Sequence, residues 1–215
     1  PLSYPSSKAV TVRLFPSGGT ATLTSDYTLT STNISIAAGA TSGTVTLRAV
    51  QDALDEADET VVIRILSVTN AVIGAASQVE ALILDDDAPP VASVALVAPA
   101  WMSEAGGSVT CRVSIAPVSA LPVTVTLAYG GTATAGQDYT YTADTVTVPA
   151  GSLSATVGIE AIEDSVREAA ETVTVQIAAA INATFSATNQ AVATLFDDGD
   201  GQHWIGPGPR VLAWT

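Results

Sequence analysis

Apolar and polar residues alternate with a period of two along most of this chain. In the first half, Val10, Val12 and Leu14 alternate with polar neighbours, and the same alternation runs over residues 61–65. In the second half it recurs over residues 123–127. Because successive side chains of a β-strand point to opposite faces of its sheet, this period predicts strands with one buried face.

The predicted strands are short, and Gly, Pro, Asn and Asp separate them at intervals of roughly 8 to 12 residues. No segment sustains the 3.6-residue period of an amphipathic helix, and residues 178–180, three alanines, are the one run that suits a helix. The pattern therefore predicts an all-β protein built from antiparallel β-sandwiches of the immunoglobulin-like type.

The chain repeats itself, and matching residues of the two copies are as far apart in the sequence as Gly18 and Gly130. The segment Gly18–Thr22 recurs as Gly130–Thr134, and Asp26-Tyr27 recurs as Asp138-Tyr139. Further matches at the same spacing are Ala38-Gly39 with Ala150-Gly151, Asp52 with Asp164, Glu56 with Glu168, Glu59-Thr60-Val61 with Glu171-Thr172-Val173, and Asp85-Asp86 with Asp197-Asp198. Two tandem homologous domains follow. The first repeat is expected over residues 1–88, the second over residues 91–200, and a C-terminal tail over residues 201–215.

The two repeats differ at their N-terminal ends. The second opens with an apolar run at Val94–Val97 and an alternating run at Val109–Ile115, and almost all counterparts of these runs would precede residue 1. We therefore expect the first repeat to lack its N-terminal strands, the first strand and most of the second. Such a loss would leave an apolar face and a strand edge uncovered.

The C-terminal tail matches neither repeat. It contains the apolar, extended run Arg210–Trp214, which is suited to add as a strand to the incomplete first repeat of a neighbouring copy. Self-association of this head-to-tail kind does not close, so it would form filaments. The alternative is that the chain is a fragment of a longer repeat protein. The sequence leaves both interpretations open.

Charge and composition exclude several function classes. The chain holds 7 basic and 21 acidic residues, whereas binding to nucleic-acid phosphates needs clustered Lys and Arg. No stretch reaches the roughly 18 consecutive apolar residues of a membrane span, so no membrane insertion is expected. His203 is the only histidine, and the single cysteine, Cys111, falls in phase with Val109 and Val113 on a predicted strand. We expect no catalytic triad, no cysteine nucleophile and no enzymatic activity.

The acidic residues are clustered rather than scattered. All but Glu80, Asp144 and Glu160 lie in short segments at equivalent positions of the two repeats, and Arg167 is the exceptional basic residue among them. Clustered carboxylates repel one another unless a cation lies between them, and Ca²⁺ takes about six to eight oxygen ligands. We expect these segments to be loops that converge at one end of each sandwich and bind Ca²⁺. Mg²⁺, which requires a stricter octahedron, is the weaker candidate.

The repeated elements resemble the Calx-beta motif of sodium–calcium exchangers, integrin β4 and many bacterial surface proteins. They are Gly-Gly-Thr-Ala-Thr followed by Asp-Tyr, an Ala-Gly turn, an Asp-x-x-x-Glu-x-x-Glu-Thr segment and a terminal run of Asp, and they occur twice in this order. For the first repeat, the resemblance implies the calcium ligands Asp26, Asp52, Asp55, Glu56, Glu59, Asp85, Asp86 and Asp87. For the second repeat, it implies Glu104, Asp138, Asp164, Glu168, Glu171, Asp197, Asp198 and Asp200. Glu104 has no counterpart in the first repeat, and Gly199 replaces the middle Asp of the terminal run in the second.

Two alternatives concern these carboxylates. The acidic loops can be solvated ends of strands, in which the charges block edge pairing and bind no metal. Asp26 and Asp138, which each precede a Tyr, can cap a turn through the backbone as readily as they can bind a metal.

The function expected from the sequence is that of a calcium-binding extracellular structural module, secreted or at the cell surface. Strand exchange would make it a self-assembling filament or surface-layer subunit. The alternative is a calcium-stabilised adhesin fragment that binds a glycan or protein ligand. Calcium would stabilise the fold by mass action, and at Asp85–Asp87, next to Ala88-Pro89-Pro90, it would stiffen the junction into a rod-like tandem.

Overall fold

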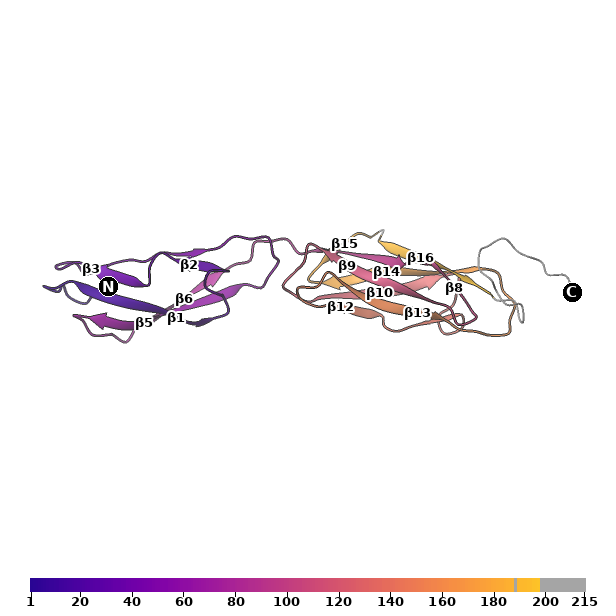
Figure 1. The fold of residues 1–215 in the computed structure, drawn as a ribbon, viewed down its shortest axis with the longest axis horizontal. Coiled ribbons are helices and arrows are strands. Elements are labelled where there is room, and N and C mark those ends of the chain that lie inside the picture. The colour runs from indigo at the N-terminus through magenta and orange to yellow at the C-terminus, as the bar shows by residue number, and fades with distance from the viewer. Residues whose placement is uncertain (188, 198–215) are drawn as a thin grey trace. The chain divides into compact units, whose positions relative to one another are not determined.

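The computed structural model describes residues 1–187 and 189–197 of the 215-residue chain. These residues form sixteen β-strands, and the described part of the chain contains no helix that could cross a membrane. The chain divides into two compact units, Pro1–Asp87 and Ala88–Thr215 (Figure 1). The prediction of an all-β fold with antiparallel sandwiches is confirmed, and the alanine run at residues 178–180 lies within a strand rather than a helix.

The second unit is a sandwich of two five-stranded sheets. Its strands are β7 (Val91–Val97), β8 (Trp101–Ser103), β9 (Ser108–Ala116), β10 (Val123–Gly131), β11 (Tyr139–Tyr141), β12 (Thr145–Val148), β13 (Ser154–Ala161), β14 (Glu171–Ile181), β15 (Thr184–Phe185) and β16 (Gln190–Phe196). One sheet has the order β12-β10-β14-β16-β8 and the other the order β11-β13-β9-β7-β15.

The core of the second unit lies between these two sheets, and β9 shows how the sequence places it there. Val109, Cys111, Val113 and Ile115 are all at most 4% exposed, while the residues between them face away from the core. Burial raises the pKa of the Cys111 thiol to about 11, so at neutral pH this cysteine is a protonated core residue. The period of two is therefore sufficient to assign the buried face of this strand.

The first unit contains fewer strands. They are β1 (Val10–Gly19), β2 (Tyr27–Leu29), β3 (Asn33–Ile36), β4 (Leu47–Ala49), β5 (Glu59–Thr69) and β6 (Gln78–Ile83). The sheet β3-β1-β5-β6 corresponds to β12-β10-β14-β16, and the pair β2-β4 corresponds to β11-β13. Within residues 1–87, all of which are described, no strand corresponds to β7, β8 or β9. The predicted lack of the N-terminal strands is confirmed.

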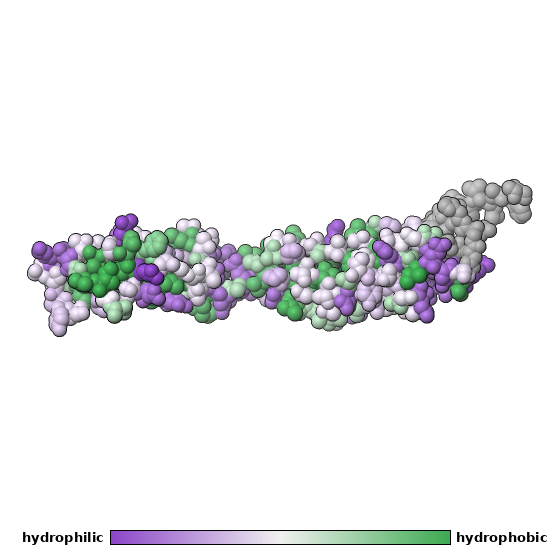
Figure 2. All heavy atoms as spheres, turned by 90° about the horizontal axis from the view of Figure 1, so that it is seen from below, coloured by the Kyte–Doolittle hydropathy of each residue, from purple (hydrophilic) through white to green (hydrophobic). Residues whose placement is uncertain are grey.

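Because residues 1–87 contain no counterparts of β7, β8 and β9, the interior that these residues form is partly uncovered. Val79 is 62% exposed, whereas Ala191 at the equivalent position of the second unit is 8% exposed. Ile65 is only half-buried, although its equivalent Ile177 is 2% exposed. Figure 2 shows hydrophobic atoms gathered at the surface of this unit. The first unit thus presents apolar surface that the second unit covers with its own strands.

A single inserted residue changes the spacing between the repeats within β1. Leu14 pairs with Ile65, and Leu127 pairs with Ile177, so these two leucines are structurally equivalent. They lie one position further apart in the chain than Gly18 and Gly130 do. The register of β1 shifts between Pro16 and Gly18, where Ser17 is the extra residue. This β-bulge keeps the buried face of β1 in phase on both sides of the insertion.

Candidate metal centres

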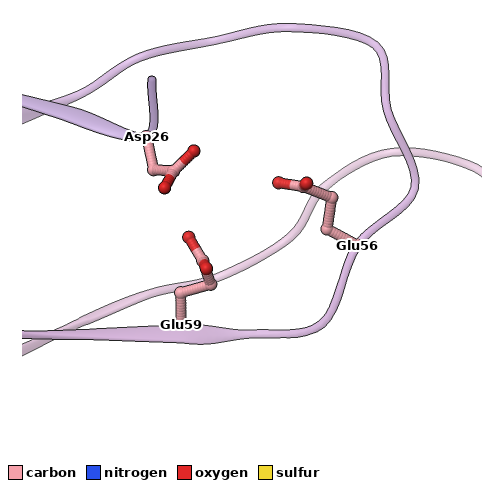
Figure 3. Close-up of side chains that lie close together, drawn as sticks. All are labelled: Asp26, Glu56 and Glu59. Atoms are coloured by element: carbon pink, nitrogen blue, oxygen red, sulfur yellow. The ribbon is translucent and has the colours of Figure 1, made fainter. Parts of the chain in front are cut away.

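Three loop-end carboxylates converge at one end of the first unit. Asp26 directly precedes β2, Glu56 lies in the loop between β4 and β5, and Glu59 is the first residue of β5. One ligand oxygen from each residue lies within 4.8 Å of the others (Figure 3). All three side chains are half-buried. We call this group the first triad.

The same group recurs in the second unit at the equivalent positions of the repeat. Asp138 precedes β11, Glu168 lies in the loop before β14, and Glu171 is the first residue of β14. Their ligand oxygens also lie within 4.8 Å of one another. We call this group the second triad. The sequence repeat is thus also a repeat of side-chain geometry.

The two aspartates are held by the tight turn that follows Gly-Gly-Thr-Ala-Thr. The Thr134 N–H donates to Oδ2 of Asp138 at 2.6 Å, and the Asp138 N–H donates to the Thr134 carbonyl oxygen at 3.0 Å. In the first unit, the Thr22 N–H donates to Oδ2 of Asp26. Each aspartate therefore caps its turn and also contributes to its triad, so the two roles considered for it are compatible.

The loop before β5 and the segment after β6 bring further carboxylates to the first triad. The Leu54 N–H donates to Oδ1 of Asp52 at 2.9 Å, which closes a turn on the loop before β5. Asp85, Asp86 and Asp87 follow the end of β6. One surface pocket is lined by carboxylates from all of these segments, namely Asp26, Asp52, Glu56, Glu59, Asp85, Asp86 and Asp87.

The aspartates of the first unit are held by neighbouring polar groups. The Asp85 N–H donates to Oδ1 of Asp58 at 3.0 Å, and Nε2 of Gln51 donates to Oδ1 of Asp86 at 2.8 Å. Neither Asp58 nor Gln51 is among the ligands inferred from the sequence. Asp58 belongs to the acidic run of residues 52–59, whereas nothing in the sequence distinguishes Gln51.

Asp55 is not part of the first triad, although it belongs to the acidic run of residues 52–59. It is 6% exposed, and it does not line the pocket. Burial and the charges of Asp86, Asp85 and Asp52 raise the pKa of Asp87, and the charge of Asp55 adds a smaller effect in the same direction. The equivalent residue in the second unit is the exposed Arg167, so the two acidic ends differ in charge at this position.

Glu104 is a deeply buried carboxylate of the second unit. It follows β8, and its backbone N–H donates to the Phe196 carbonyl oxygen at 3.0 Å, which places it beside Asp197 at the end of β16. Its side chain is 4% exposed. Burial raises the pKa of Glu104 from 4.5 to about 7, and the negative charges of Asp197, Glu168, Asp164 and Asp138 act in the same direction.

Burial and neighbouring negative charges also raise the pKa values of the triad glutamates. Burial and the charge of Asp138 raise the pKa of Glu171, and burial and the charge of Asp26 raise the pKa of Glu59. Moreover, Oε2 of Glu171 is buried and has no hydrogen-bond partner. A buried carboxylate oxygen without a donor is costly, and a bound cation would relieve this cost.

The structure gathers most of the predicted ligands at the two acidic ends. In the second unit, Asp164 closes the loop that carries Glu168 through a 2.7 Å bond from the Val166 N–H, and Oδ2 of Asp197 accepts the Glu168 N–H at 3.1 Å. Asp198 and Asp200 lie outside the described residues. The donor set consists of hard oxygens from several loops, as a calcium site requires, and among the described residues it lacks the nitrogen and sulfur ligands of a zinc site.

Comparison with known proteins identifies the family. Residues 3–87 and 92–199 both match the Calx-beta domain. The chain belongs to the Calx-beta family. It therefore carries two Calx-beta domains in tandem, as the repeated motif predicted. A search of curated proteins found no match.

Several solved structures are similar to this chain at low sequence identity. The apo form of the Calx CBD1 domain is 22% identical, with a TM-score of 0.41, over 49% of this chain and 98% of its own. CBD12 from CALX1.2 is 14% identical, with a TM-score of 0.40, over 90% of each chain. The D0-D1 domain of intimin is 14% identical, with a TM-score of 0.30, over 89% of this chain and 84% of its own.

Proposed function

We propose that this Calx-beta protein is a non-catalytic, calcium-stabilised structural module of the extracellular space or the cell surface. The observation that carries the proposal is the recurrence of the same three-carboxylate group in both units, at equivalent positions and with convergent ligand oxygens. One carboxylate oxygen of the second triad is buried without a hydrogen-bond partner. A divalent cation bound among these oxygens accounts for both features.

The chemistry supplied by calcium is charge neutralisation across several loops. In the first unit, the ion would join the turn before β2, the loop before β5 and the segment after β6. These segments are far apart in the chain and close in space, so a shared cation cross-links them. In the absence of the ion, their carboxylates repel one another, which destabilises the fold and loosens its acidic end.

The alternative of solvated acidic loops fits the described residues less well. A solvated acid is exposed and keeps its ordinary pKa, because water stabilises its charge. Glu104 is 4% exposed, with its pKa raised to about 7. A protein that placed these acids only to block strand pairing would have no reason to bury one of them among four others.

The finer part of the proposal is assembly into a filament or surface layer. Among the described residues, β4 pairs with β2 alone, and an unpaired sheet edge is a site for strand addition. The adhesin alternative has no comparable observation in its favour among the described residues.

The decisive experiment is thermal unfolding of the 215-residue chain in excess EDTA and then across added CaCl₂, with MgCl₂ as the matched control. We expect calcium to raise the melting temperature by about 10 °C or more through mass action, and magnesium to do so much less. Equal curves in EDTA and in millimolar calcium would reject the proposal. Particle size measured in the same samples separates the stabilising role from assembly.

A further inference from the structure

The sheet β3-β1-β5-β6 of the first unit has an outward face, the face that points away from the core. Leu14 and Ile63 are buried on the inner side, so the residues that alternate with them in β1 and β5 point outward. In the second unit, the sheet that contains β9 packs on the inner side of the equivalent sheet. The exposure of the outward face is therefore independent of the strands that residues 1–87 lack.

Three apolar side chains form a diagonal line across the outward face. Phe15 lies on β1, Val62 on β5 and Leu82 on β6, and the register places each of them one outward position further along the sheet than the one before. Phe15 is 52% exposed, Leu82 is 59% exposed and Val62 is half-buried. We call these three residues the apolar line. Exposed apolar side chains that lie together are typical of a contact surface.

An arginine and a glutamate lie on one side of the apolar line. Arg64 pairs with Phe15, so it lies beside one end of the line. Glu80 precedes Leu82 by one outward position on β6, so it lies nearer the other end. Both charged residues are exposed. On the other side of the line lies Gly18, whose lack of a side chain leaves room for a second surface.

The second unit has uncharged side chains at the equivalent positions of its sheet. Ala128 corresponds to Phe15 and Gln176 to Arg64, because each pair occupies the same register positions. The remaining equivalents are Thr174 for Val62, Val192 for Glu80 and Thr194 for Leu82. The fold therefore forms without a Phe, an Arg or a Glu on this face, and these residues are a property of the first unit alone.

We propose that the outward face of the first unit binds the same face of a second copy of this chain. The two copies are related by a two-fold axis that passes through Val62 and runs across the apolar line. This rotation reverses the line, so Phe15 packs against Leu82 of the second copy. It also exchanges the ends of the line, so Arg64 faces Glu80 of the second copy. Each of these contacts forms twice in the dimer.

Charge complementarity assigns a second copy to this face. Beside the apolar line the face presents one positive and one negative group, and the two-fold rotation pairs them with each other. Arg13 lies beyond the Phe15 end of the line, and the rotation directs it toward the acidic segment that follows Leu82 in the second copy. A partner with charge of a single sign would oppose either Arg64 or Glu80 with a like charge.

The area of the face indicates a weak contact. Its four strands, about 4.8 Å apart and roughly 20 Å long, cover roughly 400 Å² per copy, which is about half of the roughly 800 Å² of a standard interface. We therefore expect a monomer–dimer equilibrium that is visible below about 1 mM rather than a permanent dimer. Because the contact is isologous, it closes at the dimer.

Sedimentation velocity of the 215-residue chain in millimolar calcium, at concentrations up to about 1 mM, tests the contact. We compare Phe15→Ala, Arg64→Glu, Glu80→Arg and the double variant Arg64→Glu/Glu80→Arg. The matched controls are Val192→Ala and Val192→Arg, on the equivalent face of the second unit. Melting curves of each variant check that its fold is intact.

We expect Phe15→Ala to weaken dimerisation at least about tenfold, because it removes two apolar contacts from each dimer. Each single charge reversal should weaken it about fivefold or more, since it creates two like-charge pairs. The double variant should return it to within about threefold of the unmodified chain, because the opposite charges face each other again. The two Val192 variants should change it by less than about threefold.

Opposite effects of the two single reversals would overturn the contact. Arg64→Glu makes the acidic chain more negative and Glu80→Arg makes it less negative, so repulsion between whole chains would be strengthened by the first and relieved by the second. A chain that stays monomeric at about 1 mM would also overturn the contact. Growth beyond the dimer that neither reversal affects would overturn it in favour of strand addition. The contact uses none of the triad carboxylates, so the calcium dependence of melting tests the calcium role separately.

Discussion

Thr134 donates its backbone N–H to Oδ2 of Asp138 at 2.6 Å, at the position where Asp138 also joins the second triad. The turn therefore fixes the orientation of a carboxylate that faces two glutamates. Oδ2 accepts this backbone hydrogen bond, and the carboxylate has further lone pairs that a cation can use. The Gly-Gly-Thr-Ala-Thr motif and the acidic loops thus form one structural unit rather than two separate signals.

The substitution Asp138→Asn should distinguish the role of Asp138 in capping the turn from its role in binding calcium. An amide oxygen can still accept the Thr134 N–H, so Asp138→Asn keeps the turn but removes one negative charge. We expect calcium affinity at the second unit to fall at least about tenfold, since charge count sets the affinity of such sites. In EDTA the melting temperature should stay the same or rise, because less charge opposes Glu171. Calcium titration calorimetry with melting curves measures both.

Asp26→Asn is the matched variant in the first unit. It should remove binding at that unit and leave the second unit unchanged, because the two triads share no residue. If instead Asp138→Asn leaves calcium affinity unchanged, Asp138 acts as a cap alone and its role as a metal ligand is rejected.

Glu104 should make the stability of the calcium-free protein depend on pH. Its folded-state pKa of about 7 lies above the ordinary 4.5, so between these values the folded protein binds more protons than the unfolded one. Stability in EDTA is then lost as the pH rises from about 4.5 to 7 and returns on acidification. We expect the melting temperature of the second unit to be about 5 °C higher at pH 5 than at pH 7.5.

Glu104→Gln should flatten this profile, because the amide does not titrate. We expect the profile to flatten only partly. Burial and neighbouring carboxylates also raise the pKa of Glu168 and of Glu171, so these groups keep some pH dependence. In calcium the trend should reverse, because protons compete with the ion for the same oxygens. An unchanged pH profile in the Gln variant would show that Glu104 is not the titrating group.

Thr24 occupies a backbone position that the second unit gives to glycine. Its φ is 81°, and that of the equivalent Gly136 is 84°. The two residues make the same hydrogen bond, from their N–H to the carbonyl oxygen of Tyr27 or Tyr139, at 2.8 Å in both units. A β-branched residue is strained in this region, so Thr24→Gly should stabilise the first unit by about 1 kcal/mol. The reciprocal change, Gly136→Thr, should destabilise the second unit by a similar amount. Chemical denaturation checks both, and a loss of stability in Thr24→Gly would contradict the assignment of strain.

The fold could be predicted from the sequence because its signals are local and repeated. Alternation of apolar residues assigns the buried face of β9, and comparison of the sequence with itself reveals two domains and the strands that the first one lacks. The inserted Ser17 escaped that comparison. It lies just before Gly18, where the matching motifs begin, and a β-bulge of this size changes register without changing composition.

The site could be predicted only in part. Clustering of Asp and Glu indicates which loops carry the charge, and the two triads lie within the predicted set. The sequence does not show how deeply each acid is buried. Glu104 and Asp55 are buried, yet their local sequence resembles that of exposed acids, because their burial depends on segments that meet them only in the folded protein.

We expect Gly131 to hold the glycine motif close to the strand that carries Glu171 of the second triad. Its φ is 116°, and a Cβ at this position would lie 2.0 Å from the carbonyl oxygen of Thr172, the residue after Glu171. The same carbonyl accepts the Ala133 N–H at 3.1 Å, and the Thr172 N–H donates to Oγ1 of Thr132 at 2.9 Å. Gly131→Ala must therefore push β14 away from β10 where the triad is built. We expect a loss of about 3 kcal/mol or more in unfolding free energy, with weakened calcium binding.

Gly130→Ala is the matched control, because a Cβ there would meet no atom within 4 Å. It should leave calcium affinity within about twofold of the unmodified chain and change stability by less than about 1 kcal/mol. Denaturant unfolding in EDTA measures the loss of packing, and calcium titration measures the effect on the site. If Gly131→Ala lowers stability but leaves calcium affinity unchanged, the glycine serves the sheet alone, and the motif and the metal site are independent.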